Sequence, residues 1–290
     1  MNLDAHISQV AKEFNTYAVN YIDKCDCKSQ LWKAMSYGVM NGGKRIRPYL
    51  IIELAKYIKI KKSNYMRLAL ATEFVHAYSL IHDDLPGMDN DDLRRGKPST
   101  HKKHGEANAI LAGNSLLTLA FEILSNKKTH PSATVRIRLI ELLASLAGHK
   151  GLAGGQSLDL IYESTKPSEN NILAMHRLKT AHLFEFCMVS TLILSGSTNQ
   201  KKITEFRKYG NNFGLIFQAI DDLLDYNTDS KLDKKNRKMI GNNILKYKSL
   251  IEVNTYCKKL ADSAIKRSTF FSNEKNPLQS LIYHMINRKT

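Results

Sequence analysis

Residues 83–96, DDLPGMDNDDLRRG, are the stretch of the sequence that says most about the fold and the functional site. Five aspartates fall within ten residues of a 290-residue chain whose formal net charge is +16, and Arg94 and Arg95 follow directly. Adjacent carboxylates repel one another, and partial burial costs each on the order of 1 to 3 kcal/mol unless a cation compensates it. Two explanations stay open, a solvated acidic loop at a helix end or a cation site. The forked guanidinium groups favour the second, because they fit a phosphate beside a metal.

The available ligands narrow the kind of cation. Carboxylate oxygens without clustered histidine suit Mg²⁺, which commonly uses one or two carboxylates and completes its shell with water and a substrate phosphate. The four cysteines form no CxxC pair, so neither a zinc site nor a disulfide framework is predicted. This cysteine usage is typical of a reducing, cytosolic setting.

Length and composition set broad limits. A chain of 290 residues with 43% hydrophobic content can bury a sizeable core, and this length allows either one large domain over residues 1–290 or two domains. The 43 Lys and Arg against 27 Asp and Glu fit nucleic acid, an anionic membrane surface or phosphorylated substrates, and composition does not choose among them. The N-terminal stretch 1–14 has no apolar core typical of a signal peptide, and no apolar run reaches the ~18 residues of a membrane span. We expect a soluble, cytoplasmic protein.

Apolar residues recur at three and four residue steps along most of the chain, which predicts an all-α fold. No strand alternation is found, the stretches 90–104 and 227–248 are predicted to be polar loops, and the glycines of 151–155 are read as a break. The predicted helices cover about 3–22, 31–40, 44–58, 66–84, 106–124, 135–147, 172–195, 203–226, 249–268 and 277–287.

A basic helix start follows the turn Asn41-Gly42-Gly43. Lys44, Arg45 and Arg47 stand where free backbone N–H groups and the helix dipole attract anions. An anion site and a basic surface turn both remain open at this position. The next helix is apolar nearly all round, and it carries His76 and Asp83 seven residues apart on one face.

A second acidic cluster occurs in FQAIDDLLDY, residues 217–226. Asp221 and Asp225 are four apart on one face of an otherwise apolar helix, and Gln218 lies on the same stripe. Like charges at this spacing destabilise a bare helix, so they also require a cation. Lys179 and Thr180, near the start of another apolar helix, are either surface residues or neighbours of the acidic site.

These features together predict a helical bundle with a deep metal and phosphate site. The sequence shows no P-loop, no Ser/His/Asp arrangement and no nicotinamide fingerprint. Metal-assisted departure of a diphosphate is the chemistry that remains.

Five motifs in sequence order resemble the short-chain trans-prenyl diphosphate synthase family, most nearly its bacterial farnesyl diphosphate synthases. They are GGKRIRP (42–48), LIHDDLPGMDNDDLRRG (80–96), GGQSLD (154–159), RLKT (177–180) and FQAIDDLLD (217–225). The resemblance implies a single-domain bundle of roughly ten or more mostly antiparallel helices around a central cavity, the isoprenoid synthase fold. It also implies a homodimer.

The resemblance assigns roles to individual residues. Isopentenyl diphosphate would condense head to tail with dimethylallyl or geranyl diphosphate, after ionisation of the allylic diphosphate assisted by three Mg²⁺ ions, with Mn²⁺ as a possible substitute. The metal ligands implied are Asp83, Asp84, Asp89, Asp221, Asp222 and Asp225. The residues implied in catalysis are Asp83, Asp84, Arg94, Lys179 and Asp221. The allylic substrate would contact Arg94, Lys179, Thr180 and Gln218, and isopentenyl diphosphate would contact Lys44, Arg47, His76 and Arg95. Asp91 and Asp92 are expected to hold the loop or pair with basic side chains.

Product length is expected to depend on Tyr78 and Ser79, five and four residues before Asp83. An aromatic side chain there would stop chain growth early, which favours farnesyl diphosphate. A geranylgeranyl diphosphate synthase is the alternative within this family, and ordinary core packing is an equally open role for Tyr78.

The sequence departs from the family after Asp225, where the expected Gly-Lys pairs and Tyr-Pro are missing. Lys234 and Lys246 are the nearest equivalents of the family's two substrate-binding lysines. A weakly active or non-catalytic subunit is therefore a further alternative, although all six motif aspartates are present. A nucleic-acid binder would leave the buried aspartates unexplained, so no nucleic-acid partner is expected.

Overall fold

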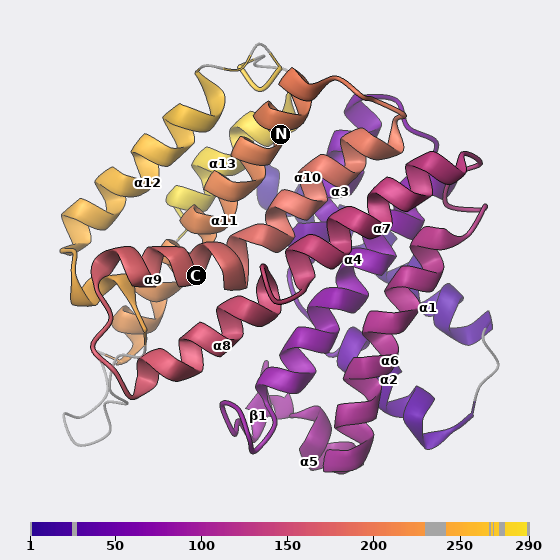
Figure 1. Ribbon diagram of the computed structural model, residues 1–290, viewed down its shortest axis with the longest axis horizontal. Coiled ribbons are helices and arrows are strands. Elements are labelled where there is room, and N and C mark those ends of the chain that lie inside the picture. Colours follow the sequence, from indigo (N-terminus) through magenta and orange to yellow (C-terminus); the bar gives the residue numbers. More distant parts are fainter. Residues whose placement is uncertain are drawn as a thin grey trace. The chain divides into compact units, whose positions relative to one another are not determined.

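Helices make up nearly all regular structure in the computed structural model, which confirms the all-α prediction (Figure 1). The structure describes residues 2–24, 28–229, 242–266, 268, 270–272 and 276–288. They group into two compact units, each described by itself below. The first unit contains residues 1–140 and 193–196, and the second contains 141–192 and 197–290.

The first unit is organised around α4, which packs most extensively on α6 and also contacts α3. Residues on every side of α4 are buried, as expected for a helix without a polar face. Asp83 is its last residue, so a largely apolar helix delivers an acidic group to its C-terminal end. The helices of this unit are α1 (Leu3–Lys24), α2 (Gln30–Met40), α3 (Ile46–Tyr57), α4 (Lys62–Asp83), α5 (Thr100–His104), α6 (Glu106–Ser125) and the first part of α7 (Ala133–Ala147).

The stretch 90–104, predicted to be a polar loop without strands, is more regular than expected. It contains a small antiparallel pair, β1 (Leu93–Arg94) and β2 (Lys97–Pro98), followed by α5. Arg95 and Gly96 connect the strands with φ angles of 55° and 74°. Two residues with positive φ make the tight hairpin turn whose twist matches that of the strands. Strands of two residues are too short to show alternation, so the sequence pattern missed them.

The second unit contains a helix that the sequence analysis missed, α8. The prediction of a break at Gly154 and Gly155 is wrong, because both glycines lie inside this helix. A Cβ on Gly155 would lie 2.6 Å from the Cα of Lys179, so this glycine permits close packing of two elements. The elements of this unit are the second part of α7, α8 (Leu152–Glu163), α9 (Glu169–His176), a π-helical turn (Arg177–Ala181), most of α10 (His182–Leu194), α11 (Gln200–Asp229), a 3₁₀ turn (Ile244–Lys246), α12 (Leu250–Ile265) and α13 (Pro277–Ile286).

The predicted helix 172–195 is interrupted by that π-helical turn, in which the N–H of His182 donates to the carbonyl of Arg177. The predicted loop 227–248 also begins later than expected, because α11 extends to Asp229. The core of this unit includes aromatic contacts along α11. Tyr209 stacks on Phe271 at 4.4 Å between ring centroids, and its hydroxyl donates to the carbonyl of Leu278 at 2.7 Å.

One helix in the described part of the chain, α6, is long and apolar enough to cross a membrane by length and composition. This differs from the expectation that no segment would qualify. Its apolar window is 39% buried, and a core helix of a soluble protein passes the same test, so the finding is weak evidence for a span.

Candidate functional site

The first aspartate motif lies at the end of α4, in the first unit. Asp83 is half-buried, whereas Asp84 is only 2% exposed. Asp84 accepts hydrogen bonds from Nε of Arg94 at 2.9 Å and from its Nη2. Burial raises the pKa of Asp84, and Arg94 opposes that shift. Asp89 is exposed, and its N–H donates to the carbonyl of Asp83 at 2.9 Å, so the loop folds back on the helix end.

Two further aspartates of this stretch pair with nearby cations, as predicted for them. Oδ2 of Asp91 lies 3.5 Å from Nη2 of Arg94. Oδ1 of Asp92 lies 2.8 Å from Nζ of Lys102, and the carbonyl of Asp92 accepts from the N–H of Ser99 at 2.9 Å. These contacts fix the loop that bears Asp89 and Arg94.

Cations from two separate segments meet in the same unit. Nη1 of Arg47 lies 3.2 Å from Nε2 of His76, and Nη1 of Arg95 donates to the carbonyl of Gly42. Burial, and then Arg47 and Arg95, hold the pKa of His76 well below its ordinary value, so its ring is neutral and Nε2 accepts from Arg47. Gly43, with φ of 116°, lets the guanidinium of Arg95 pack against the turn that precedes Lys44. The four residues predicted for isopentenyl diphosphate are thus brought into one region.

Arg45 does not join these cations, although the sequence placed it at the same helix start. It is 5% exposed and has a φ of 52° at the N-cap of α3. Its side chain points inward, donating to Glu73 at 2.6 Å, to the carbonyl of Val39 at 2.7 Å and to Asn15 at 2.9 Å. Arg45 therefore fits neither of the two alternatives left open for this helix start, an anion site or a basic surface turn, and its role is to hold the turn.

The residues predicted to set product length lie on α4. The ring of Tyr78 makes an edge contact with His82 at 5.4 Å, and burial and Asp83 raise its pKa. Ser79 is buried, and its hydroxyl donates to the carbonyl of His76 at 3.0 Å. Tyr78 is half-buried among its neighbours, so its packing role and its proposed role in product length are compatible.

In the second unit, Lys179 and Thr180 both stand on the π-helical turn. Turns of this kind are rare in proteins, and those that occur are often found at functional sites. Nζ of Lys179 donates to Oδ2 of Asp159 on α8 at 2.5 Å. The hydroxyl of Thr180 donates to Oε1 of Gln218 on α11 at 2.7 Å.

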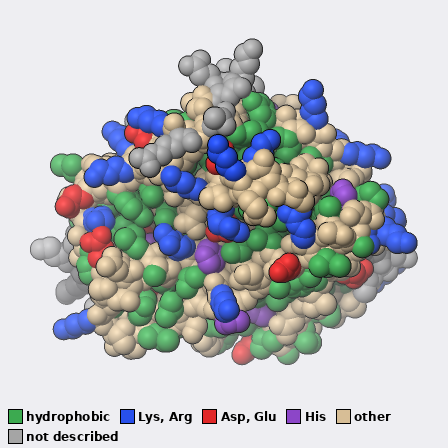
Figure 2. Space-filling view, turned by 45° about the horizontal axis from the view of Figure 1, so that its top comes forward, with side chains coloured by type: hydrophobic (Ala, Val, Ile, Leu, Met, Phe, Trp, Pro, Cys, Tyr) green, Lys and Arg blue, Asp and Glu red, His purple; other side chains and the backbone are tan. Residues whose placement is uncertain are grey.

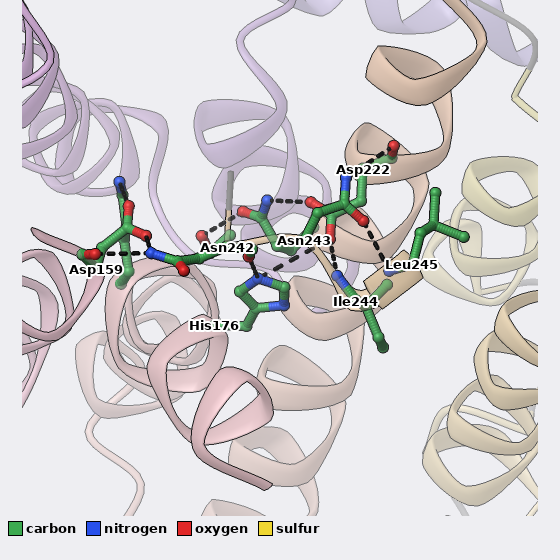
Figure 3. Close-up of polar contacts among 10 residues, drawn as sticks. Asp159, His176, Asp222, Asn242, Asn243, Ile244 and Leu245 are labelled. Carbon is green, nitrogen blue, oxygen red and sulfur yellow. Dashed lines mark hydrogen bonds and ion pairs between the residues drawn. The ribbon is translucent and has the colours of Figure 1, made fainter. Parts of the chain in front are cut away.

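The second aspartate motif continues this network (Figure 3). Nε2 of Gln218 donates to Oδ1 of Asp222 at 2.8 Å, and the N–H of Ile244 donates to Oδ2 at 2.9 Å. Burial raises the pKa of Asp222, while His176, whose Nε2 lies 3.9 Å from Oδ2, opposes the shift. Asp222 is 5% exposed, so both of its oxygens are engaged inside the unit.

Asp221 and Asp225 are more accessible than Asp222. Oδ1 of Asp221 accepts from Nη1 of Arg288 at 3.1 Å, and the Asp221 side chain is 32% exposed. Asp225 is exposed, one turn further along α11. The motif therefore presents two partly open carboxylates on one face and one buried carboxylate.

Of the two loop lysines, only Lys246 lies within the described residues. Lys246 is exposed on the 3₁₀ turn, and Lys234 lies outside the described residues. Lys248, which the sequence analysis did not select, pairs with Glu169 at 2.6 Å.

Sequence reasoning gave no role to several residues of these networks. Asp159 was part of the quoted motif GGQSLD, and that motif was the available signal. Asn242 and Arg288 had no signal, because their contacts join segments distant in sequence.

The donors present are compatible with Mg²⁺ bound together with a phosphate ligand. Across residues 2–24, 28–229 and the described parts of 242–288, no group of three or more His, Cys, Asp or Glu side chains is arranged to hold a metal by itself. Mg²⁺ needs only one or two carboxylates when water and substrate phosphate complete its shell. Asp83 and Asp89 in one unit, and Asp221 and Asp225 in the other, are oxygen donors of that kind.

Comparisons of this chain with known protein families, sequences and structures agree with one another. Residues 28–267 match the family described as Polyprenyl synthetase. The farnesyl diphosphate synthase of Geobacillus stearothermophilus is 36% identical over 265 residues, covering 90% of this chain and 88% of the relative. The apo FPP/GFPP synthase from Zymomonas mobilis superposes with a TM-score of 0.86 at 35% identity, covering 98% and 99% of the two chains. The geranyltransferase from Helicobacter pylori complexed with magnesium and isoprenyl diphosphate has a TM-score of 0.81 at 29% identity, covering 99% and 97%.

Proposed function

The chain belongs to the polyprenyl synthetase family, and on that premise we propose that it joins isopentenyl diphosphate head to tail to dimethylallyl or geranyl diphosphate. We expect the product to be farnesyl diphosphate, because several relatives of this chain are named farnesyl diphosphate synthase. The observation that carries the proposal is that each aspartate motif lies beside basic side chains of its own unit. Arg94 contacts Asp84, and Lys179 lies on the turn whose Thr180 is linked through Gln218 to Asp222.

We propose Mg²⁺ as the metal: Asp83, Asp84 and Asp89 would bind it in the first unit, and Asp221, Asp222 and Asp225 would bind it in the second. The Helicobacter pylori relative contains magnesium and isoprenyl diphosphate, which supports this choice. When bound, the metal would neutralise the negative charge that grows on the leaving diphosphate.

The side chains of the chain itself would bind and orient the two substrates. Arg94 and Lys179 would donate to the allylic diphosphate, and these charge-assisted hydrogen bonds strengthen as its negative charge grows. Arg47 and Arg95 would bind the diphosphate of isopentenyl diphosphate together with Lys44. Neutral His76 accepts from Arg47 and so orients that guanidinium without adding competing charge.

The carbon chemistry would then need little from protein side chains. The double bond of isopentenyl diphosphate attacks the allylic cation, and the departing diphosphate accepts the proton that is lost. No side-chain base is assigned to this step. Exclusion of water from the site would protect the allylic cation from being quenched.

A geranylgeranyl diphosphate synthase remains the alternative product assignment, and Tyr78 favours the shorter product. A weakly active or non-catalytic subunit is less consistent with the chain, because it keeps all six motif aspartates. The basic surplus gives little support to a nucleic-acid binder. On the face shown in Figure 2, Lys and Arg side chains are interspersed with apolar and neutral ones.

We also propose a cytoplasmic homodimer. Large apolar side chains are exposed on the first unit, with Ile110 at 39%, Leu111 at 50% and Ile137 at 62%. A second copy covering these residues of α6 and α7 would remove them from water.

One assay tests the function. The protein is incubated with Mg²⁺, isopentenyl diphosphate and either dimethylallyl or geranyl diphosphate, and the products are sized by chromatography. We expect diphosphate release and a C15 product from wild type, and a loss of at least about a hundredfold in Asp83→Ala. Equal rates for wild type and Asp83→Ala, or no release from either, would contradict the proposal.

A further inference from the structure

We propose that Asp159 is a positioning residue that fixes the ammonium group of Lys179 and the segment Asn242–Leu245, so that the allylic diphosphate meets preorganised cations. The inference deepens the proposed function and rests on it. It concerns contacts within the second unit alone.

Each oxygen of the Asp159 carboxylate has its own partner. Oδ2 accepts from Nζ of Lys179 at 2.5 Å, and Oδ1 accepts from Nδ2 of Asn242 at 2.8 Å. The carbonyl of Asp159 also accepts from the same Nδ2 at 2.7 Å. One residue of α8 therefore links the π-helical turn to Asn242.

Asn242 is held at a second point. Its carbonyl lies 3.0 Å from Nε2 of His176, whose side chain is 4% exposed. Asn243 then donates from Nδ2 to the carbonyl of Asp222 at 3.2 Å, and the N–H of Ile244 donates to the Asp222 carboxylate at 2.9 Å. Figure 3 shows these contacts converging on the segment from α8, α9 and α11. The segment is therefore fixed on three sides directly before Lys246.

The backbone of Lys179 is fixed by packing, but its side chain requires a partner. Gly155 and the π-helical turn approach so closely that a Cβ on Gly155 would lie 2.6 Å from the Cα of Lys179. A lysine stem has many rotamers, so ordering it carries an entropic cost. Asp159 meets that cost before substrate arrives. The ammonium group has three donors, so one can remain on Asp159 while others bind a phosphate.

The test compares wild type with Asp159→Asn, which keeps an oxygen for Asn242 but loses the charge that orients Lys179. We expect the KM for the allylic diphosphate to rise about tenfold, while the KM for isopentenyl diphosphate stays within about twofold. In a Lys179→Gln background, Asp159→Asn should add less than about twofold, because the residue acts through Lys179. Glu169→Gln is the matched control, since it breaks the Glu169–Lys248 pair of the same unit, and neither KM should change.

A second readout does not depend on turnover. Titration of inorganic diphosphate in the presence of Mg²⁺ should give a Kd about tenfold weaker for Asp159→Asn than for wild type. Hydrogen exchange at the amides of residues 243–245 should accelerate in Asn242→Ala, which removes the other contact of Asp159 while leaving the carboxylate in place. Asn242→Ala also serves as the test variant if Asp159→Asn does not fold.

The outcomes separate the two proposals. No turnover by wild type would reject the proposed function. The diphosphate titration would still test the positioning role of Asp159, because it does not depend on turnover. An unchanged KM and an unchanged Kd in Asp159→Asn would overturn the positioning role. Equal, additive losses from Asp159→Asn and Lys179→Gln would overturn it as well.

Discussion

Replacing Glu73 with glutamine should destabilise the protein strongly, because this carboxylate neutralises the buried Arg45. The two side chains are 3% and 2% exposed, and Oε1 of Glu73 lies 2.6 Å from Nη1 of Arg45. Removing one partner of a buried ion pair typically costs about 3 to 5 kcal/mol, since the remaining charge stays out of water. Arg45 keeps its bonds to Val39 and Asn15, so we expect about 3 kcal/mol, the lower end of that range.

The measurement is urea-induced unfolding of the metal-free protein, followed by far-UV circular dichroism. Glu13→Gln is the control, because Glu13 pairs with Lys62 at 2.5 Å and with Lys56 at 3.6 Å on the surface, where the Glu13 side chain is 31% exposed and the lysines are 64% and 41% exposed. That variant should lose less than about 1 kcal/mol. The double variant Arg45→Met with Glu73→Met should regain much of the loss, since no charge is then left unpaired. A loss below about 1 kcal/mol in Glu73→Gln would refute the reasoning.

Four further predictions concern other parts of the chain. Tyr78→Ala should lengthen the product beyond C15, measured by chromatography of the dephosphorylated products, and unchanged product length would remove Tyr78 from that role. Gly155→Ala should weaken Mg²⁺-dependent diphosphate binding by at least about tenfold, because its Cβ would displace the backbone of Lys179, and calorimetry measures the effect. Burial raises the pKa of Cys257 to about 12 from an ordinary value of 9.0, so its peptide should resist iodoacetamide at pH 8 until the protein unfolds. Because the folded pKa is the higher one, this thiol contributes stability below pH 9 that is lost as pH rises toward 12. Ile137→Glu should convert dimers to monomers in size-exclusion chromatography with light scattering, and a wild-type monomer would contradict the proposed homodimer.

The helices could be predicted because burial imposes a period on the sequence. The stretch 66–84 is apolar on every side, and α4 is indeed buried all round from Tyr65 to Ile81. The acidic pairs that begin at Asp83 and Asp221 could be found for the same reason. Charged residues at the end or on one face of an apolar helix interrupt its apolar periodicity.

Other features depend on contacts that no local pattern records. Gly155 looked like a helix breaker because its close neighbour, Lys179, is 24 residues later. Arg45 looked like Lys44 and Arg47, and only the position of Glu73 shows that it points inward. The contacts of Asp159 with Asn242 join residues 83 apart, so the motif was recognisable but its role was not.

The π-helical turn has a consequence for how this sequence tolerates insertions and deletions. Its wider ring accommodates one more residue than an α-helical turn, and one residue corresponds to a rotation of about 100° around the axis. The faces of α9 and α10 are therefore out of phase by that angle. Deleting one residue between Arg177 and Ala181 would restore a continuous helix and leave α10 in its present packing register. The deletion would instead disrupt the turn itself, because the extra residue sets the directions in which the Lys179 and Thr180 side chains point.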